Sequence, residues 1–306
     1  MTTKKDVHLD ESMARLNQFL PLADATAQKL LDTWDKLDDY VLHEIALTSL
    51  FKIYPKNDNE SEVLLKCVAL NQFYSAGLLN KDLIPMAKHI VELNSQINID
   101  KALQEGDWTI VSQIAQGGEL SCSYPSFASK YCNWHNPKAF PIYDKYVVEV
   151  LCALKTEGKL STFSKIKEIK SEEDLNKRYL TFGKTLEEIV RRFNLKFPLD
   201  KANGEIIYKI LDRALWILGK YCFGKGVSSE DIALALGEIL LRVAWDKYIV
   251  SKSKNGAIKV VKNGETSTNT KESLREISKQ IGFAPNEKWD TRQFGKNLIE
   301  FINSKK

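Results

Sequence analysis

Residues 126–144 read SFASKYCNWHNPKAFPIYD, and the rest of the chain is interpreted around this stretch. Its first part is predicted to be a short helix that carries Lys130. Pro137 should end that helix, because proline lacks a backbone N–H and pushes the preceding residue out of helical geometry. Asp144 then stands at the start of the next apolar run, where an Asp commonly caps a helix. A lysine-bearing helix, a polar and aromatic loop and a carboxylate are together what a pocket for a flipped nucleic-acid base needs.

The sequence before residue 246 is dominated by helical patterns. Apolar residues recur at intervals of three and four over most of this length, and no strand is predicted there. The last helix of this part is expected to run from Ser228 to about Trp245. We therefore predict a helical domain over residues 1–245.

The pattern changes at Tyr248. Two short β-prone runs flank Asn255-Gly256, which is a strong signal for a β-hairpin. Two amphipathic helices are expected to follow, at residues 270–281 and 291–302. Residues 246–306 are thus predicted to form a small α+β module, and the fold class of the whole chain is mainly α.

The net charge is only +4, but the basic excess lies near the end of the chain. Residues 246–306 hold 13 Lys or Arg against 7 Asp or Glu, whereas the remaining 245 residues hold 31 against 33. This asymmetry favours a polyanionic partner, although a solvated lysine-rich surface would give the same counts. Phosphate contacts with nucleic acid are predicted for Arg275, Arg292 and Lys296. An oligomerisation or docking module of the same size is the alternative.

Several classes of protein are disfavoured by what the sequence lacks. No apolar run approaches the ~20 residues of a membrane span, and the first residues lack the apolar core of a signal peptide. The five cysteines are scattered without a C-x-x-C pair, which favours reduced thiols in a cytoplasm. There is no P-loop, HExxH or zinc-deaminase pattern, so neither a cofactor nor a metal is predicted. We expect a cytoplasmic protein without a membrane partner.

Two segments resemble the helix-hairpin-helix DNA glycosylase superfamily. Residues 69–75, ALNQFYS, are similar to the helix end with which that family faces the extrahelical base. Residues 140–147, FPIYDKYV, are similar to its P-V-D-T-H-V motif and place the family's catalytic aspartate on Asp144. The order of elements agrees over roughly residues 40–220, and the nearest branch is that of divergent bacterial 8-oxoguanine DNA glycosylase-like proteins. The family's L-P-G-x-G hairpin has no clear counterpart.

The resemblance implies excision of a damaged or modified base that is flipped out of double-stranded DNA. Asp144 would stabilise positive charge on the sugar as the N-glycosidic bond breaks, and Lys130 would be a candidate nucleophile. The residues expected to stack on the base or to read its edge are Asn71, Gln72, Tyr74, Trp134, His135, Asn136 and Tyr143.

Each of these residues also has a purely structural interpretation. Asp144 would only cap its helix, and Lys130 would lie on a solvated face. Trp134 and Tyr143 would serve packing, and His135 would be an ordinary loop histidine. At the level of function, the alternatives are a non-catalytic nucleic-acid-binding protein, such as one that senses modified DNA in defence against phage, and a helical interaction scaffold.

Overall fold

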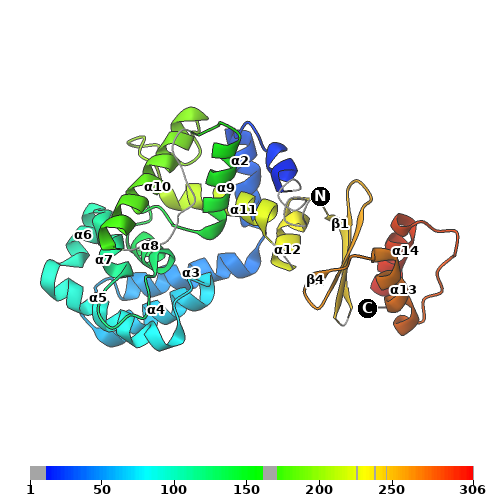
Figure 1. Cartoon of the computed structure of the whole chain (residues 1–306), viewed down its shortest axis with the longest axis horizontal. Coiled ribbons are helices and arrows are strands. Elements are labelled where there is room, and N and C mark those ends of the chain that lie inside the picture. The colour runs from blue at the N-terminus through cyan, green and yellow to red at the C-terminus, as the bar shows by residue number, and fades with distance from the viewer. Residues whose placement is uncertain (1–11, 161–170, 225–226, 238, 246, 306) are drawn as a thin grey trace. The chain divides into compact units, whose positions relative to one another are not determined.

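The computed structural model describes residues 12–160, 171–224, 227–237, 239–245 and 247–305. The chain forms two compact units, Met1–Cys222 and Phe223–Lys306 (Figure 1). The first unit is helical, and the second contains a small antiparallel sheet followed by helices. The predicted fold class, mainly α with a small α+β module, is therefore confirmed.

Side-chain caps begin several helices of the first unit. The side chain of Asn59 accepts the backbone N–H of Ser61, and that of Ser171 accepts the N–H of Asp174. Such caps satisfy backbone donors that have no partner inside the helix. The helices are α2 (Asp24–Trp34), α3 (Asp38–Ile53), α4 (Glu60–Tyr74), the 3-10 turn η1 (Asn80–Asp82), α5 (Leu83–Ile97), α6 (Ile99–Glu105), α7 (Thr109–Ala115), α8 (Pro125–His135), α9 (Lys145–Thr156), α10 (Glu172–Arg192) and α11 (Tyr208–Phe223). Within the described ranges, no helix is both long and apolar enough to cross a bilayer.

α8 lies inside the first unit and contacts α3, α4, α6 and α7 (Figure 1). Pro125 occupies its first position, where the missing backbone N–H has no helical partner to lose. The helix ends at His135, two residues before Pro137, so the predicted stop is confirmed. Every residue from Phe127 to Asn133 is buried, which makes α8 a core helix on all its faces.

The loop after α8 is fixed by hydrogen bonds from its surroundings. The hydroxyl of Ser129 accepts the backbone N–H of Tyr143 at 2.9 Å. The hydroxyl of Tyr179, on α10, donates to the carbonyl of Pro141 at 2.6 Å. These anchors set the position of Asp144, which directly follows the loop.

The second unit contains a four-stranded antiparallel sheet in the order β1-β2-β3-β4. Its β2 and β3 form the predicted hairpin around Asn255-Gly256, and the predicted pair of helices follows; both predictions are confirmed. The elements are α12 (Val227–Ala235), β1 (Ile239–Trp245), β2 (Tyr248–Ser253), β3 (Ile258–Lys262), β4 (Glu265–Thr266), α13 (Thr270–Ile281) and α14 (Thr291–Ser304).

The helix predicted from Ser228 to Trp245 is wrong over its second half. α12 ends at Ala235, and β1 pairs with β2 instead of continuing the helix. A short apolar run fits a helix or a buried strand equally by its spacing, and here the pairing with β2 decides. The second compact unit begins at Phe223, so it includes α12 and β1. Both of these segments were predicted from the sequence to belong to the domain over residues 1–245.

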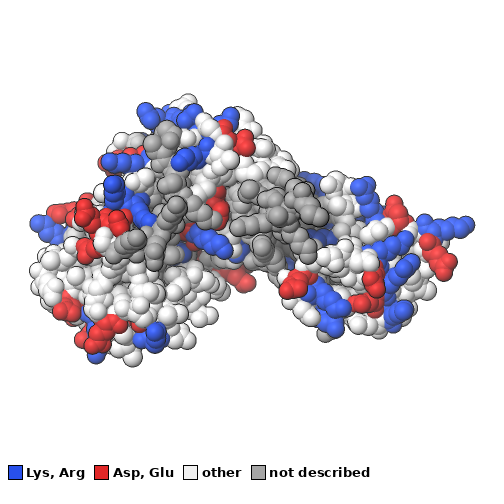
Figure 2. Space-filling view, viewed as in Figure 1, with Lys and Arg blue, Asp and Glu red and all other residues white. Residues whose placement is uncertain are grey.

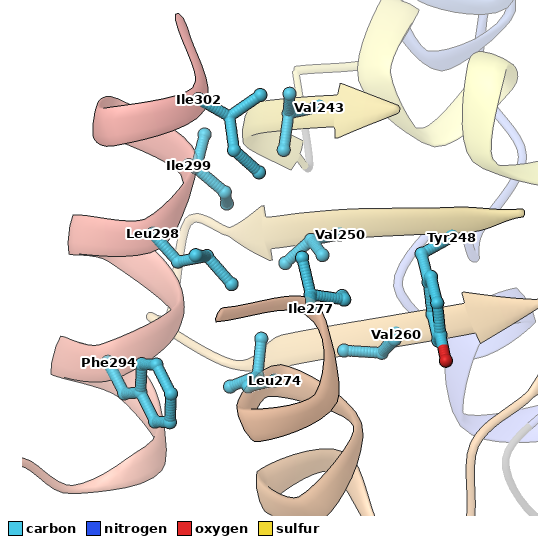
Figure 3. Close-up of a cluster of buried hydrophobic side chains, with 10 residues drawn as sticks. All are labelled: Val243, Tyr248, Val250, Val260, Leu274, Ile277, Phe294, Leu298, Ile299 and Ile302. Carbon is cyan, nitrogen blue, oxygen red and sulfur yellow. The ribbon is translucent and has the colours of Figure 1, made fainter. Parts of the chain in front are cut away.

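The core of the second unit lies between the sheet and its last two helices. Figure 3 shows the side chains of α13 and α14 pointing at the strands. Val250 on the central strand β2 is paired with both Val243 and Val260, so the three valines form one buried row. The helices cover this row with Leu274, Ile277, Phe294, Leu298, Ile299 and Ile302.

Candidate functional site

A cavity of about 320 Å³ opens in the first unit among residues of α2, α3, α4, α8, α9 and α11. This volume lies within the range of small-molecule sites. Charged groups are concentrated in its lining, where Lys130, Asp144 and Asp212 come together. The aromatic part of the lining consists of Trp34, Tyr40, Phe73, Tyr74, Tyr146 and Trp216.

Lys130 and Asp144 form a buried ion pair in this lining. Nζ of Lys130 lies 3.1 Å from Oδ2 of Asp144, and their side chains are only 3% and 12% exposed. The same ammonium donates to the hydroxyl of Ser126 at 2.9 Å. The alternative that Lys130 lies on a solvated face is therefore wrong.

Asp144 also caps α9, as its structural interpretation predicts, while its role in catalysis stays a prediction. Its Oδ1 accepts the backbone N–H of Tyr146 at 2.8 Å, while Oδ2 faces Lys130. The cap fixes the carboxylate at the mouth of the helix, and the second oxygen is left for the ion pair. Asp144 thus both caps α9 and forms the ion pair with Lys130 in the cavity lining.

Asp212, on α11, is a second carboxyl in the same lining, and we did not predict it from the sequence. Burial raises its pKa to about 7; the charge of Lys209 opposes this rise and that of Asp144 adds to it. Within the described part of the chain, its Oδ1 is buried and has no hydrogen-bond partner. The sequence feature that could have indicated Asp212 is its position between Leu211 and Leu215 on an otherwise apolar helix face.

A hydrogen-bonded network stands behind this lining. The carboxylate of Glu44 accepts from the hydroxyl of Tyr74 at 2.9 Å, from Lys209 at 3.0 Å and from Arg213. Burial opposes ionisation of Glu44, but the two cations together lower its pKa. Lys209 is also held 4.4 Å from the ring centroid of Trp134. Tyr74 therefore links the network to the cavity.

Aromatic rings form one wall of the cavity. Trp216 packs edge-on against Trp34 at 5.5 Å between ring centroids, and lies 5.0 Å from Tyr40. Tyr146 stands perpendicular to Trp216, with 6.4 Å between the centroids. Nζ of Lys220 lies 4.6 Å from the centroid of Tyr146. Such a wall offers a flat ligand apolar contact with a cation at its rim.

Of the residues predicted to bind a base, Tyr74 lines this cavity. Asn71 instead closes a turn, because its amide donates to the carbonyl of Leu78 at 2.8 Å and its oxygen accepts the N–H of Leu78 at 3.0 Å. Gln72 is exposed, and Asn136 donates to the carbonyl of Leu103 at 3.1 Å. A role in binding a base stays a prediction for these residues.

Trp134 and His135 line a second cavity of about 420 Å³ in the same unit. Burial lowers the pKa of His135 well below its usual value, and the nearby charge of Lys66 adds to this effect. The imidazole is therefore neutral near pH 7. Tyr143 packs edge-on against Phe182 at 5.0 Å and does not line either cavity.

The predicted phosphate-binding residues lie on the helices of the second unit. Arg275 is exposed on α13, and Arg292 is exposed on α14. Nζ of Lys296 lies 3.8 Å from the carboxylate of Glu300 one turn along α14. Among the residues that the structure describes, His, Cys, Asp and Glu do not gather into a group that would hold a metal ion.

Comparison with known proteins relates the chain to one family. The family model HI_0787_N, described as an N-terminal domain, matches residues 26–139, which include Lys130 but end before Asp144. A protein of Haemophilus influenzae, named only "Uncharacterized protein", is 35% identical over 177 residues, which are 56% of this chain and 74% of that protein. No solved structure shows a significant match. The chain therefore belongs to the family of this Haemophilus influenzae protein, and its residues 26–139 correspond to the HI_0787_N domain.

Proposed function

We propose that the first unit is a DNA N-glycosylase, which removes a damaged or modified base flipped out of double-stranded DNA. The observation that carries the proposal is the Lys130–Asp144 pair, 3.1 Å apart in the lining of an aromatic-walled cavity. Aromatic faces suit a flat base, and a carboxylate beside them suits the cationic sugar that forms when the base leaves. The resemblance of residues 140–147 to a glycosylase motif points to the same chemistry.

In the proposed reaction, the bond between the sugar C1′ and the base nitrogen breaks, and its electron pair leaves with the base. Asp144 stabilises the positive charge that develops on the sugar. Water then adds to C1′ and loses a proton to solvent, while the departed base anion takes one up from solvent, which leaves an abasic sugar and the free neutral base. If Lys130 attacks C1′ instead, it must first release a proton, and a covalent lysine–sugar adduct forms.

Asp212 adds a feature that suits recognition of a base. A carboxyl with a pKa of about 7 is protonated in about half of the molecules at that pH. The protonated form donates a hydrogen bond, and the ionised form accepts one. Asp212 lines the cavity, and its buried Oδ1 has no hydrogen-bond partner among the described residues.

The test is incubation of the full chain with duplexes that carry different lesions or modified bases, scored for abasic sites. Asp144→Asn is the informative variant, because asparagine also caps helices well but carries no charge. We expect base release to fall at least about a hundredfold in this variant. Borohydride trapping separates attack by water from attack by Lys130. Failure of the native chain to release any base across the panel rejects the proposal.

A non-catalytic protein that binds modified DNA, as in a defence against phage, is the second candidate. It is favoured by the state of the Lys130 ammonium, which already donates hydrogen bonds to Ser126 and Asp144 and is therefore not free to act as a nucleophile. It is also favoured by the missing glycosylase hairpin. Binding of a modified duplex without any base release would select this candidate.

A helical scaffold is supported by a different observation, the exposed aliphatic side chains on α3. Leu42, Ile45 and Ile53 are 63%, 58% and 66% exposed, respectively. Exposed apolar groups of this kind often mark protein interaction surfaces. For all three candidates we propose a cytoplasmic location, where the five free cysteines would stay reduced.

A further inference from the structure

The second unit carries a groove of about 630 Å³ between α13 and the chain that follows it. One side is formed by polar side chains of α13, and the other by residues 283–289 at the approach to α14. The groove is separate from the cavity of the first unit, and the proposed base excision makes no use of it.

Three cations line the α13 side of this groove: Lys271, Arg275 and Lys279. They recur every fourth residue, so they lie along one face of the helix at a rise of about 6 Å per step. Arg275 and Lys279 are exposed, and none of the three makes an ion pair with a described residue. Glu287 is an acid on the opposite rim. The groove therefore has a net positive lining.

An aromatic platform forms the other side. The rings of Phe283 and Trp289 are stacked, with 6.1 Å between centroids and an interplanar angle of 26°. Phe283 continues the stack to Phe294 at 6.4 Å and 25°. Phe283 and Trp289 are half-buried: they pack on the core of the unit and leave part of each ring in the groove.

We propose that this groove binds single-stranded nucleic acid. Bases stack on the platform of Phe283 and Trp289, and successive phosphates contact the line of Lys271, Arg275 and Lys279. A line of single cations at regular intervals suits the regular charges of a strand, and the platform suits unpaired bases.

A duplex does not fit this arrangement, because its bases are stacked on one another and expose no face to an aromatic ring. Figure 2 shows basic and acidic side chains interspersed over the visible face of the second unit. A broad basic surface of the kind that holds duplex backbones is not seen on this face. These features favour one strand over two.

The test measures binding of a fluorescent 12-nucleotide oligothymidylate and of a 12-base-pair duplex to the full chain by anisotropy, over a series of salt concentrations. The single strand should bind more tightly. Trp289→Leu should weaken its binding about 5- to 150-fold, the range that base stacking on an aromatic ring spans, and Trp289→Phe should restore most of it. Equal affinity for the two probes overturns the proposal.

The charge variant K271Q/R275Q/K279Q keeps the proposal testable if Trp289→Leu does not fold, since its changes lie on a helix surface. The slope of log affinity against log salt should become shallower by about 2, or ~0.7 for each lost phosphate contact. Lys254→Gln, exposed and outside the groove, is the matched control and should leave the slope unchanged. An unchanged slope in the triple variant, or equal competition by oligoglutamate, overturns the proposal. Base release by the first unit is scored separately, so failure of one proposal does not imply failure of the other.

Discussion

Replacing Asp212 by asparagine should make the protein more stable at pH 8 than the native chain. Burial raises the pKa of this carboxyl from 3.8 to about 7, so ionising it in the folded state is unfavourable. Between these two pH values the folded protein binds more protons than the unfolded chain, and the free energy of unfolding falls as pH rises. The full destabilisation is reached only when the pH is well above 7 and the carboxyl of the folded protein is ionised. Asparagine has nearly the same shape and no charge to bury.

The size of the effect follows from the shift of about three pKa units, which corresponds to about 4 kcal/mol at 1.36 kcal/mol per unit. About 2.5 kcal/mol of this falls between pH 5 and pH 8. The charges of Asp144, Lys130 and Lys209 are present in both proteins, so their own contributions to stability largely cancel in the difference.

Urea unfolding of the native chain and of Asp212→Asn at pH 5, 6, 7 and 8 measures this difference. The two stability curves should diverge with rising pH, in favour of the variant. Parallel curves over this range would show that Asp212 titrates at an ordinary pKa, and would remove the argument that it is held near neutrality for a ligand. A variant that is less stable at every pH would show that the acid serves the fold.

Three further predictions concern stability. Burial lowers the pKa of Lys66 to about 8, so the folded state releases this proton at lower pH than the unfolded chain does. Relative to Lys66→Met, the unfolding free energy of the native chain should therefore rise by about 2 kcal/mol between pH 7.5 and 9.5. No relative change would refute the burial argument. Glu44→Gln should cost about 3–5 kcal/mol in urea unfolding, because it leaves the buried Lys209 and the half-buried Arg213 without their carboxylate. A cost near zero would mean that water reaches both cations. Leu298→Ala should cost about 2–5 kcal/mol in the unfolding of the second unit, since Leu298 is fully buried against the sheet, and a smaller loss would indicate that the core collapses around the gap.

Features of the fold that depend on a few adjacent residues were predictable from the sequence. The hairpin at Asn255-Gly256 follows from turn chemistry, and the end of α8 follows from Pro137. β1 was missed because an apolar run becomes a strand only when a partner strand is present, and the partner is not visible in the run itself.

In the candidate site, too, residues that depend on local patterns were predictable and residues that depend on tertiary packing were not. Asp144 was predictable, because a cap residue at a helix start is a local pattern. Asn71 has a side chain that could read the edge of a base. In the structure, however, the nitrogen and the oxygen of its amide are both hydrogen-bonded to the backbone of Leu78. Asp212 could not be placed beside Asp144 from the sequence, because only the packing of α11 against α9 brings these two acids into one lining.

Asp212 in the cavity lining is a residue that folding alone would not require. α11 buries Leu211 and Leu215 on either side of Asp212, and a leucine at 212 would fill the same helix face without a charge to desolvate. The buried Oδ1 of this acid has no hydrogen-bond partner in the described structure, and the charges of Lys209 and Lys130 offset the cost of burying the carboxylate only in part. Such costs are characteristic of sites where a ligand supplies the missing partner. Asp212→Leu should therefore stabilise the protein at pH 8 and, under the proposed function, weaken binding of a modified duplex. Unchanged binding would show that Asp212 does not contact the base.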